Sequence, residues 1–409
     1  MKPLTTTCAI VGGGPCGMML GVLLARAGVD VTVLEKYPDF FRDFRGDTIH
    51  PSTLNLLYEL GWLDDFLKIP HQELQHIGAR INGEYVEVGD FTHLPTHCKF
   101  VALMPQWDFL NFLAERGKRY PTFRLLMKTE GTDLVITDGR VTGVIAKDDA
   151  GSATIDAKLV VGTDGRHSTM RERAGLHVED FGAPMDVLWM RISKHADDPV
   201  QPLGSMRDGR ILVMIDRNEY WQCAFLIPKG TFEQLKAAGV EALHRDLVEA
   251  VPQLQDRVNE IDDWSKVSLL EVVVDRLKVW HRPGLLCIGD AAHAMSPIGG
   301  VGVNLAVQDA VAAANALAAP LLAGDDTEAA LAQIQSRRMF PTKVTQAFQV
   351  FVQQHAIMPV LGGKSTKAPP PLIMRLFDEF PRLRGLPARL IGMGVRPENV
   401  HTPDAFSSS

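Results

Sequence analysis

The sequence predicts an α/β protein with a Rossmann-like domain, an inserted domain dominated by β-strands, and a helical C-terminal segment. Three observations predict this architecture. The chain opens with an apolar strand, a glycine-rich turn, a helix and a second strand, which together make a βαβ unit. Residues 185–275 are mostly strand-like. From about residue 284, an apolar strand, a second glycine-rich turn and a long helix return the chain to the first domain.

These changes of pattern also predict where the domains begin and end. A chain of 409 residues is longer than one hydrophobic core usually supports, which favours two domains. The predicted units are a discontinuous first domain (residues 1–75, 101–182 and 276–360), a sheet-based inserted domain (76–100 and 183–275) and a C-terminal helical tail (361–409).

Composition excludes several classes of partner. A net charge of −7 without a basic block argues against nucleic acid, because phosphate binding needs concentrated lysine and arginine. The best candidate for a membrane span, residues 310–323, is short and contains Pro320. Five scattered cysteines without a CxxC pair, and no metal-ligand spacing, predict buried free thiols and no metal. With no signal-peptide pattern, we expect a cytoplasmic monomer or homodimer.

The stretch GGGPCG, residues 12–17, carries the first chemical signal. Gly12 permits a tight turn, Gly14 lets the backbone approach a pyrophosphate, and Gly17 lets helix and strand pack closely. The start of the helix supplies free N–H groups for the phosphates. Glu35, at the end of the next strand, is placed to bind a ribose hydroxyl, which favours FAD or NAD over NADP. The alternative is a merely convenient tight turn, which the full βαβ context disfavours.

Two further motifs follow at the ends of predicted strands. In VVGTDGRHSTMR, Asp164 begins a turn; taken alone, this is an ordinary loop with a helix N-cap at Ser168. In GDAAHAMSPIGGVGVN, Asp290 ends a buried strand and glycines precede a helix that we expect to start near Val303. His293 in this stretch is most simply a hydrogen-bonded structural histidine.

The order and contents of the three motifs resemble the class A, single-component FAD-dependent monooxygenases related to para-hydroxybenzoate hydroxylase. The resemblance runs from about Thr6 to Gln354 and is weakest in the inserted sheet domain. It implies a FAD-binding domain of the para-hydroxybenzoate hydroxylase (GR2) type. In that family, the residues matching Arg45 and Asp290 lie against the pyrophosphate and the ribityl chain. The implied FAD contacts are Gly12, Gly14, Pro15, Gly17, Glu35, Lys36, Arg45, Gln106, Asp164, Asp290, Pro297, Gly300, Gly302, Val303 and Asn304.

The resemblance also implies a reaction. NAD(P)H is the transient reductant, and O2 reacts with reduced flavin to form a C4a-hydroperoxide that hydroxylates an apolar aromatic ring, phenolic or polyketide-like. The chain has one dinucleotide fingerprint, taken by FAD, so NAD(P)H must bind without a Rossmann unit of its own. Alternatives are a non-oxygenating FAD-dependent dehydrogenase or oxidase, a flavin halogenase, and a non-catalytic flavin-binding protein. The Trp-x-Trp-x-Ile-Pro pattern of the halogenases is absent.

The substrate is expected between the flavin ring and the inserted sheet. His50, just past Arg45, is a candidate base or hydrogen-bond donor to a phenol, and Pro297 would form the wall beside the reacting flavin carbon. The apolar candidates are equally well explained as core residues, since strands bury such side chains in any case. The candidate substrate contacts are His50, Trp189, Arg191, Met214 and Trp221.

Overall fold

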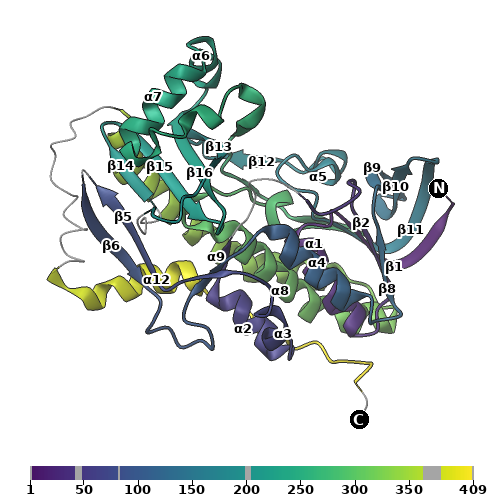
Figure 1. Cartoon of the computed structure of the whole chain (residues 1–409). Helices are drawn as coiled ribbons and strands as arrows, with labels where there is room; N and C mark the ends of the chain where they lie inside the picture. Colours follow the sequence, from purple (N-terminus) through teal and green to yellow (C-terminus); the bar gives the residue numbers. More distant parts are fainter. Residues whose placement is uncertain (1, 42–47, 82, 199–203, 363–378, 408–409) are drawn as a thin grey trace.

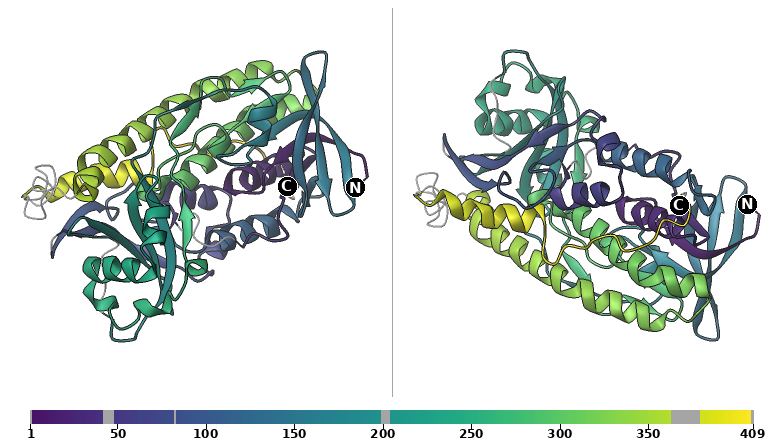
Figure 2. Two further views of the ribbon diagram at one scale, coloured as in Figure 1. Left: turned by 90° about the horizontal axis from the view of Figure 1, so that it is seen from above. Right: turned by 90° about the horizontal axis from the view of Figure 1, so that it is seen from below.

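The structure of the protein is a computed structural model in which two large sheets are joined by long helices (Figures 1 and 2). One sheet holds the N-terminal strands, and the other lies with the small helices α6 and α7 at the opposite end of the molecule. The long helices α8 and α9 pack against each other. The described residues are 2–41, 48–81, 83–198, 204–362 and 379–407.

In the described part of the chain, the first sheet has eight strands and is mainly parallel. Strands β20, β11, β1, β2 and β8 lie in that order and pair in parallel. β19 extends the sheet beyond β20, while β10 and β9 form an antiparallel extension of β11. The strands are β1 Leu4–Val11, β2 Val31–Leu34, β8 Phe123–Leu126, β9 Glu130–Thr137, β10 Arg140–Asp148, β11 Gly151–Gly162, β19 His281–Arg282 and β20 Leu285–Cys287.

Apolar helices cover this sheet. α1 (Pro15–Arg26) packs against β1 and β2, and α4 (Gln106–Gly117) and α8 (Val301–Ala323) pack against α1. The helical segment from Ile298 to Ala323 is long and apolar enough to cross a bilayer, but 72% of its most apolar window is buried inside the protein. It is therefore a core helix. The apolar stretch at residues 310–323 belongs to a longer helix than the sequence indicated, and α8 continues past Pro320.

In the described part of the chain, the second sheet has seven strands, in the order β17-β13-β16-β15-β14-β5-β6. The β5–β6 hairpin joins it through parallel pairing of β5 with β14. Both faces are buried, since alternate side chains enter different apolar clusters. The strands are β5 His76–Ile81, β6 Glu84–Asp90, β13 Met185–Ser193, β14 Gly204–Arg207, β15 Arg210–Asp216, β16 Tyr220–Pro228 and β17 Ser268–Leu270. They come from both segments of the predicted inserted domain, whose boundaries stay a prediction.

Shorter elements complete the fold. Between β16 and β17, two short helices, α6 and α7, are separated at Gly239. The small strands are β3 Thr48–Ile49, β4 Gln72–Leu74, β7 Val101–Leu103, β12 Val178–Asp180 and β18 Asp275–Leu277. The remaining helices are α2 Pro51–Glu59, α3 Leu63–Phe66, α5 Thr169–Arg173, α6 Phe232–Ala237, α7 Val240–Ala250, α9 Glu328–Val352, the π-helical turn η6 Gln353–Ile357, α10 Met358–Leu361 and α12 Gly385–Gly392.

The five cysteines all lie in the described part of the chain, and each is free and buried, as predicted. Burial raises the pKa of the thiols of Cys8 and Cys223 to about 12. Since the thiolate is the reactive form, these two side chains act as small apolar residues of the core.

Candidate active site

A large cavity separates the two sheets. Its volume is about 1370 Å³, which exceeds the roughly 300–1000 Å³ of a typical small-molecule pocket. One end is formed by the β1–α1 turn, the ends of β2 and β11, and the start of α8. The other end is formed by one face of the seven-stranded sheet together with α9, η6 and α12. The volume is sufficient for a large cofactor and a second ligand in line with it.

The backbone of the β1–α1 turn is accessible from the cavity to a group such as a phosphate. Gly12 has a φ of +110°, and a Cβ there would lie 2.4 Å from the carbonyl oxygen of Thr163. Gly14 lines the cavity, and a Cβ on it would meet no atom within 4 Å, so the space beside it is open. No side chain caps the start of α1, which leaves its N–H groups available for an anion.

Glu35 follows the last residue of β2 and lies beside the glycine turn. Its carboxylate lines the cavity and accepts hydrogen bonds from the backbone N–H of Gly13 (3.1 Å) and of Tyr37 (3.0 Å). These bonds fix the carboxylate at the end of β2, next to the glycine turn. Because each carboxylate oxygen has more than one lone pair, it can still accept a ribose hydroxyl.

The second glycine-rich turn faces the same cavity. Gly300 has a φ of +62°, and this left-handed residue precedes the first residue of α8, Val301, without any side-chain cap. The helix thus begins two residues before the expected Val303, and Gly302 and Val303 both line the cavity. The uncapped start presents free N–H groups and the positive end of the helix dipole.

Asp290 also lines the cavity, and within the described residues its half-buried carboxylate accepts no hydrogen bond from the protein. A polar group in this position needs a partner. The hydroxyls of a ribityl chain fit this carboxylate, the open glycine turn fits a pyrophosphate, and the start of α8 fits the electron-rich edge of a flavin ring. The donor set therefore suits FAD.

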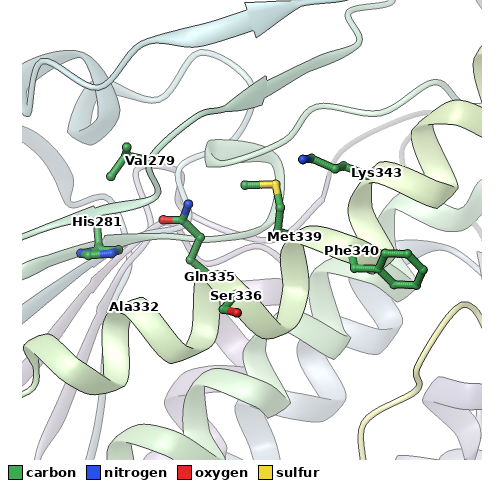
Figure 3. Close-up of a pocket in the computed structure, with 8 residues that line it drawn as sticks. All are labelled: Val279, His281, Ala332, Gln335, Ser336, Met339, Phe340 and Lys343. Atoms are coloured by element: carbon green, nitrogen blue, oxygen red, sulfur yellow. The ribbon is translucent and has the colours of Figure 1, made fainter.

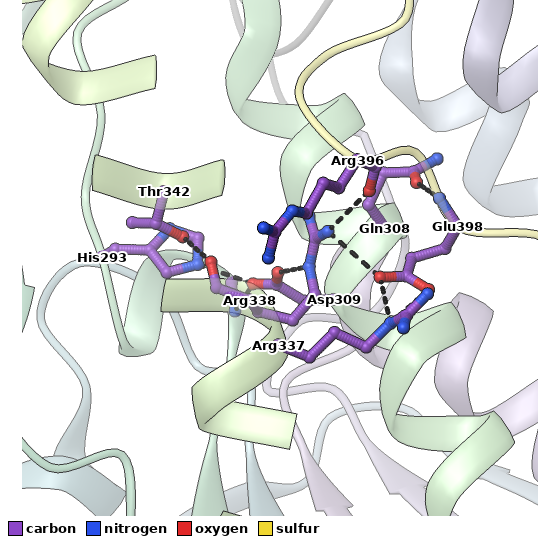
Figure 4. Close-up of polar contacts among 9 residues, drawn as sticks. His293, Gln308, Asp309, Arg337, Arg338, Thr342, Arg396 and Glu398 are labelled. Carbon is purple, nitrogen blue, oxygen red and sulfur yellow. Dashed lines mark hydrogen bonds and ion pairs between the residues drawn. The ribbon is translucent and has the colours of Figure 1, made fainter. Parts of the chain in front are cut away.

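A buried polar network holds the Asp290 turn in place (Figure 4). Asp309 on α8 is fully buried, and it accepts hydrogen bonds from the N–H of Gly289 (3.1 Å), from His293 Nε2 (2.6 Å) and from Arg338 Nε (2.8 Å). Arg338 also contacts Glu398 near the C-terminus. Burial alone would raise the pKa of Asp309, but His293 and Arg338 outweigh it and the pKa is lowered. His293 is thus a structural residue in this network.

Asp164 has a structural part in the cavity wall. Its carboxylate accepts hydrogen bonds from Ser168 Oγ (2.5 Å) and from the N–H of Met170 (3.0 Å). Ser168 in turn caps α5 by accepting from the N–H of Arg171, as the sequence predicted. Burial raises the pKa of Asp164. The turn lines the cavity, but the carboxylate is already engaged by the protein.

The remaining predicted cofactor residues divide into three groups. Pro15, Lys36, Gln106 and Pro297 line the cavity. Gly17 does not; a Cβ there would lie 2.0 Å from the carbonyl oxygen of Gly12, so its role is close packing. Arg45 lies outside the described residues.

The prediction that Asn304 contacts FAD is corrected. It does not line the cavity, because its amide oxygen is buried and accepts hydrogen bonds from Ser52 Oγ (2.7 Å) and Thr53 Oγ1 (2.6 Å). These bonds tie α2 to α8, so we remove Asn304 from the candidate FAD contacts.

His50 lies in the cavity wall beside the end of α12 and the turn before α8. Its side chain is buried and lines the cavity. Nδ1 lies 2.8 Å from the carbonyl oxygen of Ile391, and Nε2 is buried with no partner within the described residues. Burial lowers the pKa of His50 to about 4, so the ring is neutral at neutral pH. It is a hydrogen-bonding group and a poor proton carrier at that pH.

The chain from residue 5 to residue 347 matches the family described as the FAD binding domain. A 6-methylpretetramide 4-monooxygenase from Streptomyces rimosus is 33% identical over 391 residues, which are 94% of this chain and 92% of that protein. The chain belongs to the class A FAD-dependent aromatic monooxygenases. FAD as cofactor, the Rossmann-like FAD-binding fold and monooxygenase activity, each predicted from the sequence, are thereby confirmed.

Two further similarities place the monooxygenase within its family. A para-nitrophenol 4-monooxygenase from Pseudomonas sp. (strain WBC-3) is 26% identical over 331 residues, 78% of this chain and 79% of that protein. The structure of an anhydrotetracycline hydroxylase from Streptomyces rimosus superposes with a TM-score of 0.78 at 22% identity, over 97% of this chain and 77% of that one. This second likeness shows the fold.

The substrate contacts predicted for this monooxygenase require correction. Trp189 lines the cavity. Met214 and Trp221 do not; they belong to the apolar cluster on the other face of the seven-stranded sheet, which α7 covers. Arg191 is exposed and lies over the ring of Tyr220, with 4.9 Å between guanidinium carbon and ring centroid. We therefore remove Arg191, Met214 and Trp221 from the candidate contacts.

Sequence reasoning missed most of the cavity wall. In β15, the neighbours of Met214 point into the cavity, since side chains of a strand alternate between faces. The α9–η6 region and α12 contribute further apolar side chains. A helical spacing of apolar residues in the tail was the available signal, although it does not say what the helix covers. The missed lining residues include Ile77, Val213, Ile215, Leu226, Phe348, Val352, Leu390 and Ile391.

A second hollow, of about 540 Å³, lies on the outside of α9 (Figure 3). Gln335 reaches it from α9, but the amide also accepts from the N–H of Trp280 (2.9 Å) and donates to the carbonyl oxygen of Lys278 (3.0 Å). The hollow contains none of the residues predicted for the site, and its polar group at Gln335 is engaged in holding a loop.

Proposed function

We propose that this monooxygenase hydroxylates an apolar phenol of several fused rings, of the polyketide type, using NAD(P)H as reductant and O2 as oxidant. The observation that carries the proposal is the cavity of about 1370 Å³ that continues from the FAD end into an apolar chamber. The relative from Streptomyces rimosus that is 33% identical to this chain is named for 6-methylpretetramide. A fused-ring phenol should fill this chamber more completely than a single-ring one, which favours it as the substrate.

The chain's own residues have separable parts in this function. The glycine turn of α1, with Glu35, would bind the adenosine and pyrophosphate end of FAD, and Asp290 would bind its ribityl chain. The uncapped start of α8 would stabilise negative charge on a bound flavin. When bound, FAD supplies hydride acceptance and oxygen activation. Pro297 and the apolar walls keep water away from the reacting atoms.

The seven-stranded sheet positions the substrate. Val213, Leu226 and Trp189 form one wall, and Phe348 and Leu390 face the same chamber from helices. These side chains bury an aromatic ring without offering it charge, so orientation falls to the few polar groups that reach the chamber. His50 is the buried one with an available ring nitrogen within the described residues. We propose it as a contact to a substrate hydroxyl.

The test is a panel of phenols under ¹⁸O2. The holoenzyme is given NADH or NADPH with para-nitrophenol, resorcinol, 1-naphthol and 1,8-dihydroxyanthraquinone, and NAD(P)H oxidation, peroxide and labelled product are measured. The proposal expects the fused-ring phenols to stimulate oxidation more strongly, and label to enter the product. Faster coupled turnover of the single-ring phenols would overturn the polycyclic assignment, and unlabelled product from every compound would overturn hydroxylation of phenols.

The state and location of the protein are also proposals. We propose a cytoplasmic location, which the free, buried cysteines and the burial of α8 in the core support, and a monomer or homodimer. Cytosolic proteins keep their thiols reduced. Light scattering of the purified holoenzyme distinguishes monomer, dimer and larger assemblies.

A further inference from the structure

His50 connects the chamber to the C-terminal helix α12. Its Nδ1 lies 2.8 Å from the backbone carbonyl oxygen of Ile391. A carbonyl oxygen only accepts, so Nδ1 must carry the proton, and a neutral ring then presents a bare lone pair at Nε2. That atom is buried in a residue that lines the cavity, and it makes no hydrogen bond of acceptable geometry within the described part of the chain, although the backbone of Gly300 lies near enough to raise the pKa of the ring. A buried acceptor of this kind is unfavourable until a donor reaches it.

The carbonyl that sets this tautomer is itself held firmly. A Cβ on Gly392 would lie 2.9 Å from a methyl carbon of Leu94 and 3.0 Å from the ring of Phe91, so the end of α12 packs directly on both side chains. On its other side, the side chain of Ile391 lies beside Gly299, in the turn before α8. The position of α12 therefore decides where the His50 ring points.

We propose that the Ile391 carbonyl fixes His50 as a hydrogen-bond acceptor for an O–H group of the substrate, which makes α12 part of the substrate-recognition apparatus. The substrate keeps its proton, and the hydrogen bond selects phenols over ethers and sets which ring carbon faces the flavin. His50 contacts the substrate, while Ile391 and Gly392 are positioning residues. The inference rests on the proposed function, because it assigns a substrate contact in the same chamber.

Two substitutions separate the two nitrogens of the ring. In His50→Asn, the side-chain amide can replace Nδ1 and keep the bond to Ile391, but nothing occupies the place of Nε2. In His50→Gln, the amide oxygen can replace Nε2 as acceptor, but the bond to Ile391 is lost. The first variant therefore removes the acceptor, and the second removes its orientation.

The measurement is binding of 1-naphthol and of 1-methoxynaphthalene to the holoenzyme by calorimetry. The two probes share a ring system, and the ether lacks the O–H donor. We expect the wild type to prefer 1-naphthol by about tenfold, the usual net effect of one such hydrogen bond. His50→Asn should bind both equally, and His50→Gln should keep only part of the preference. Equal affinities in the wild type would overturn the proposal without any variant.

A substitution in α12 tests the positioning role. Gly392→Ala places a methyl group against Leu94 and Phe91, so it displaces the end of the helix and should lower the preference for 1-naphthol severalfold. Gly385→Ala, at the other end of α12, meets no atom within 4 Å and is the matched control. In the His50→Asn background, Gly392→Ala should change the preference no further, because the acceptor is already gone.

The outcomes are distinguishable from failure of the proposed function. Undiminished preference in Gly392→Ala or in His50→Gln would refute positioning by α12. Weaker binding of both probes on adding Gly392→Ala in the His50→Asn background would show a structural effect unconnected with His50. Absence of oxygen insertion in the ¹⁸O2 panel would refute hydroxylation of phenols while leaving the binding preference intact. Thermal unfolding of each holoenzyme confirms that the variants are folded.

Discussion

Replacing Asp309 with asparagine tests the buried network behind the FAD site. The carboxylate receives hydrogen bonds from Gly289, His293 and Arg338, and the side chains of Asp309, His293 and Arg338 are at most 2% exposed. Asparagine has nearly the same shape but no charge, so the Arg338 guanidinium loses the carboxylate that neutralises it. The Gly289–Asp290 turn loses an anchor at the same time. The variant should be less stable and should hold FAD less tightly.

The size of the effect follows from the burial. Removing one partner of a buried ion pair typically costs about 3–5 kcal/mol, because the other charge stays buried. The entropy of unfolding is roughly 2.1 cal mol⁻¹ K⁻¹ per residue, and the chain has 409 residues. If the protein unfolds as one unit, Tm should therefore fall by about 4–6 °C. Asp325→Asn, at the exposed end of α8, should leave Tm unchanged within about 1 °C.

The assay is thermal unfolding of both variants from pH 3 to pH 8, with flavin retention measured by absorbance after gel filtration. The pKa of Asp309 is lowered in the folded protein, so its stabilisation is complete above the unfolded value of about 3.9 and is lost as pH falls through the lower folded value. The gap between wild type and Asp309→Asn should persist from pH 5 to 8 and close below about pH 4. A Tm equal to that of the wild type at pH 7 would refute the network's role.

Three further predictions follow from the site. Asp290→Ala should lower FAD affinity by about tenfold to a hundredfold, as loss of hydrogen bonds to a charged group predicts, and unchanged flavin retention in equilibrium dialysis would show that the ribityl chain lies elsewhere. Val213→Phe should reduce the affinity for 1,8-dihydroxyanthraquinone at little cost in stability. Met214→Ala should instead lower the free energy of unfolding in urea by about 2–5 kcal/mol and leave binding unchanged. The reverse pattern would contradict the assigned faces of β15. His50 has a pKa of about 4 in the folded protein and 6.5 in the unfolded chain. The free energy of unfolding of the wild type should therefore fall by roughly 3 kcal/mol relative to His50→Asn as pH falls from 6.5 to 4. Parallel stability curves for the two proteins would contradict the burial of His50 as a neutral ring.

The parts of the fold that could be predicted from sequence are those with local causes. The turn after β1 follows from three glycines at fixed spacing, and the cap at Ser168 follows from its neighbours. The position of Asp290 in the cavity wall could be predicted because it lies just after a buried strand and before a glycine turn. Each of these features depends on residues close in the chain, so the sequence pattern contains the required information.

The substrate wall could not be predicted because the seven-stranded sheet is buried on both faces. In β15, Val213 and Met214 are both apolar, so the alternation that normally separates a buried face from an exposed one disappears. The pattern therefore could not indicate which of the two faces the cavity. The prediction that Met214 contacts the substrate was wrong, because its side chain lies on the other face of β15. The prediction that Asn304 contacts FAD was wrong for a related reason. Its hydrogen-bond partners, Ser52 and Thr53, lie about 250 residues away in sequence.

The sequence predicted a helical C-terminal tail but assigned it no function. Its contact with His50 spans 341 residues of sequence, and the spacing of apolar residues in α12 says only that one face is covered. Tertiary contacts of this range leave no local trace in a single sequence.

The two-sided burial of the seven-stranded sheet has a consequence for how such an enzyme acquires new substrates. Alternate residues of one strand serve different purposes: Val213 shapes the chamber, while Met214 anchors α7. Substitutions at the chamber positions can enlarge or reshape the space for a ring system while the packing that keeps the sheet folded is left untouched. A strand of this kind lets selection, or a protein engineer, vary specificity one position at a time without first securing extra stability.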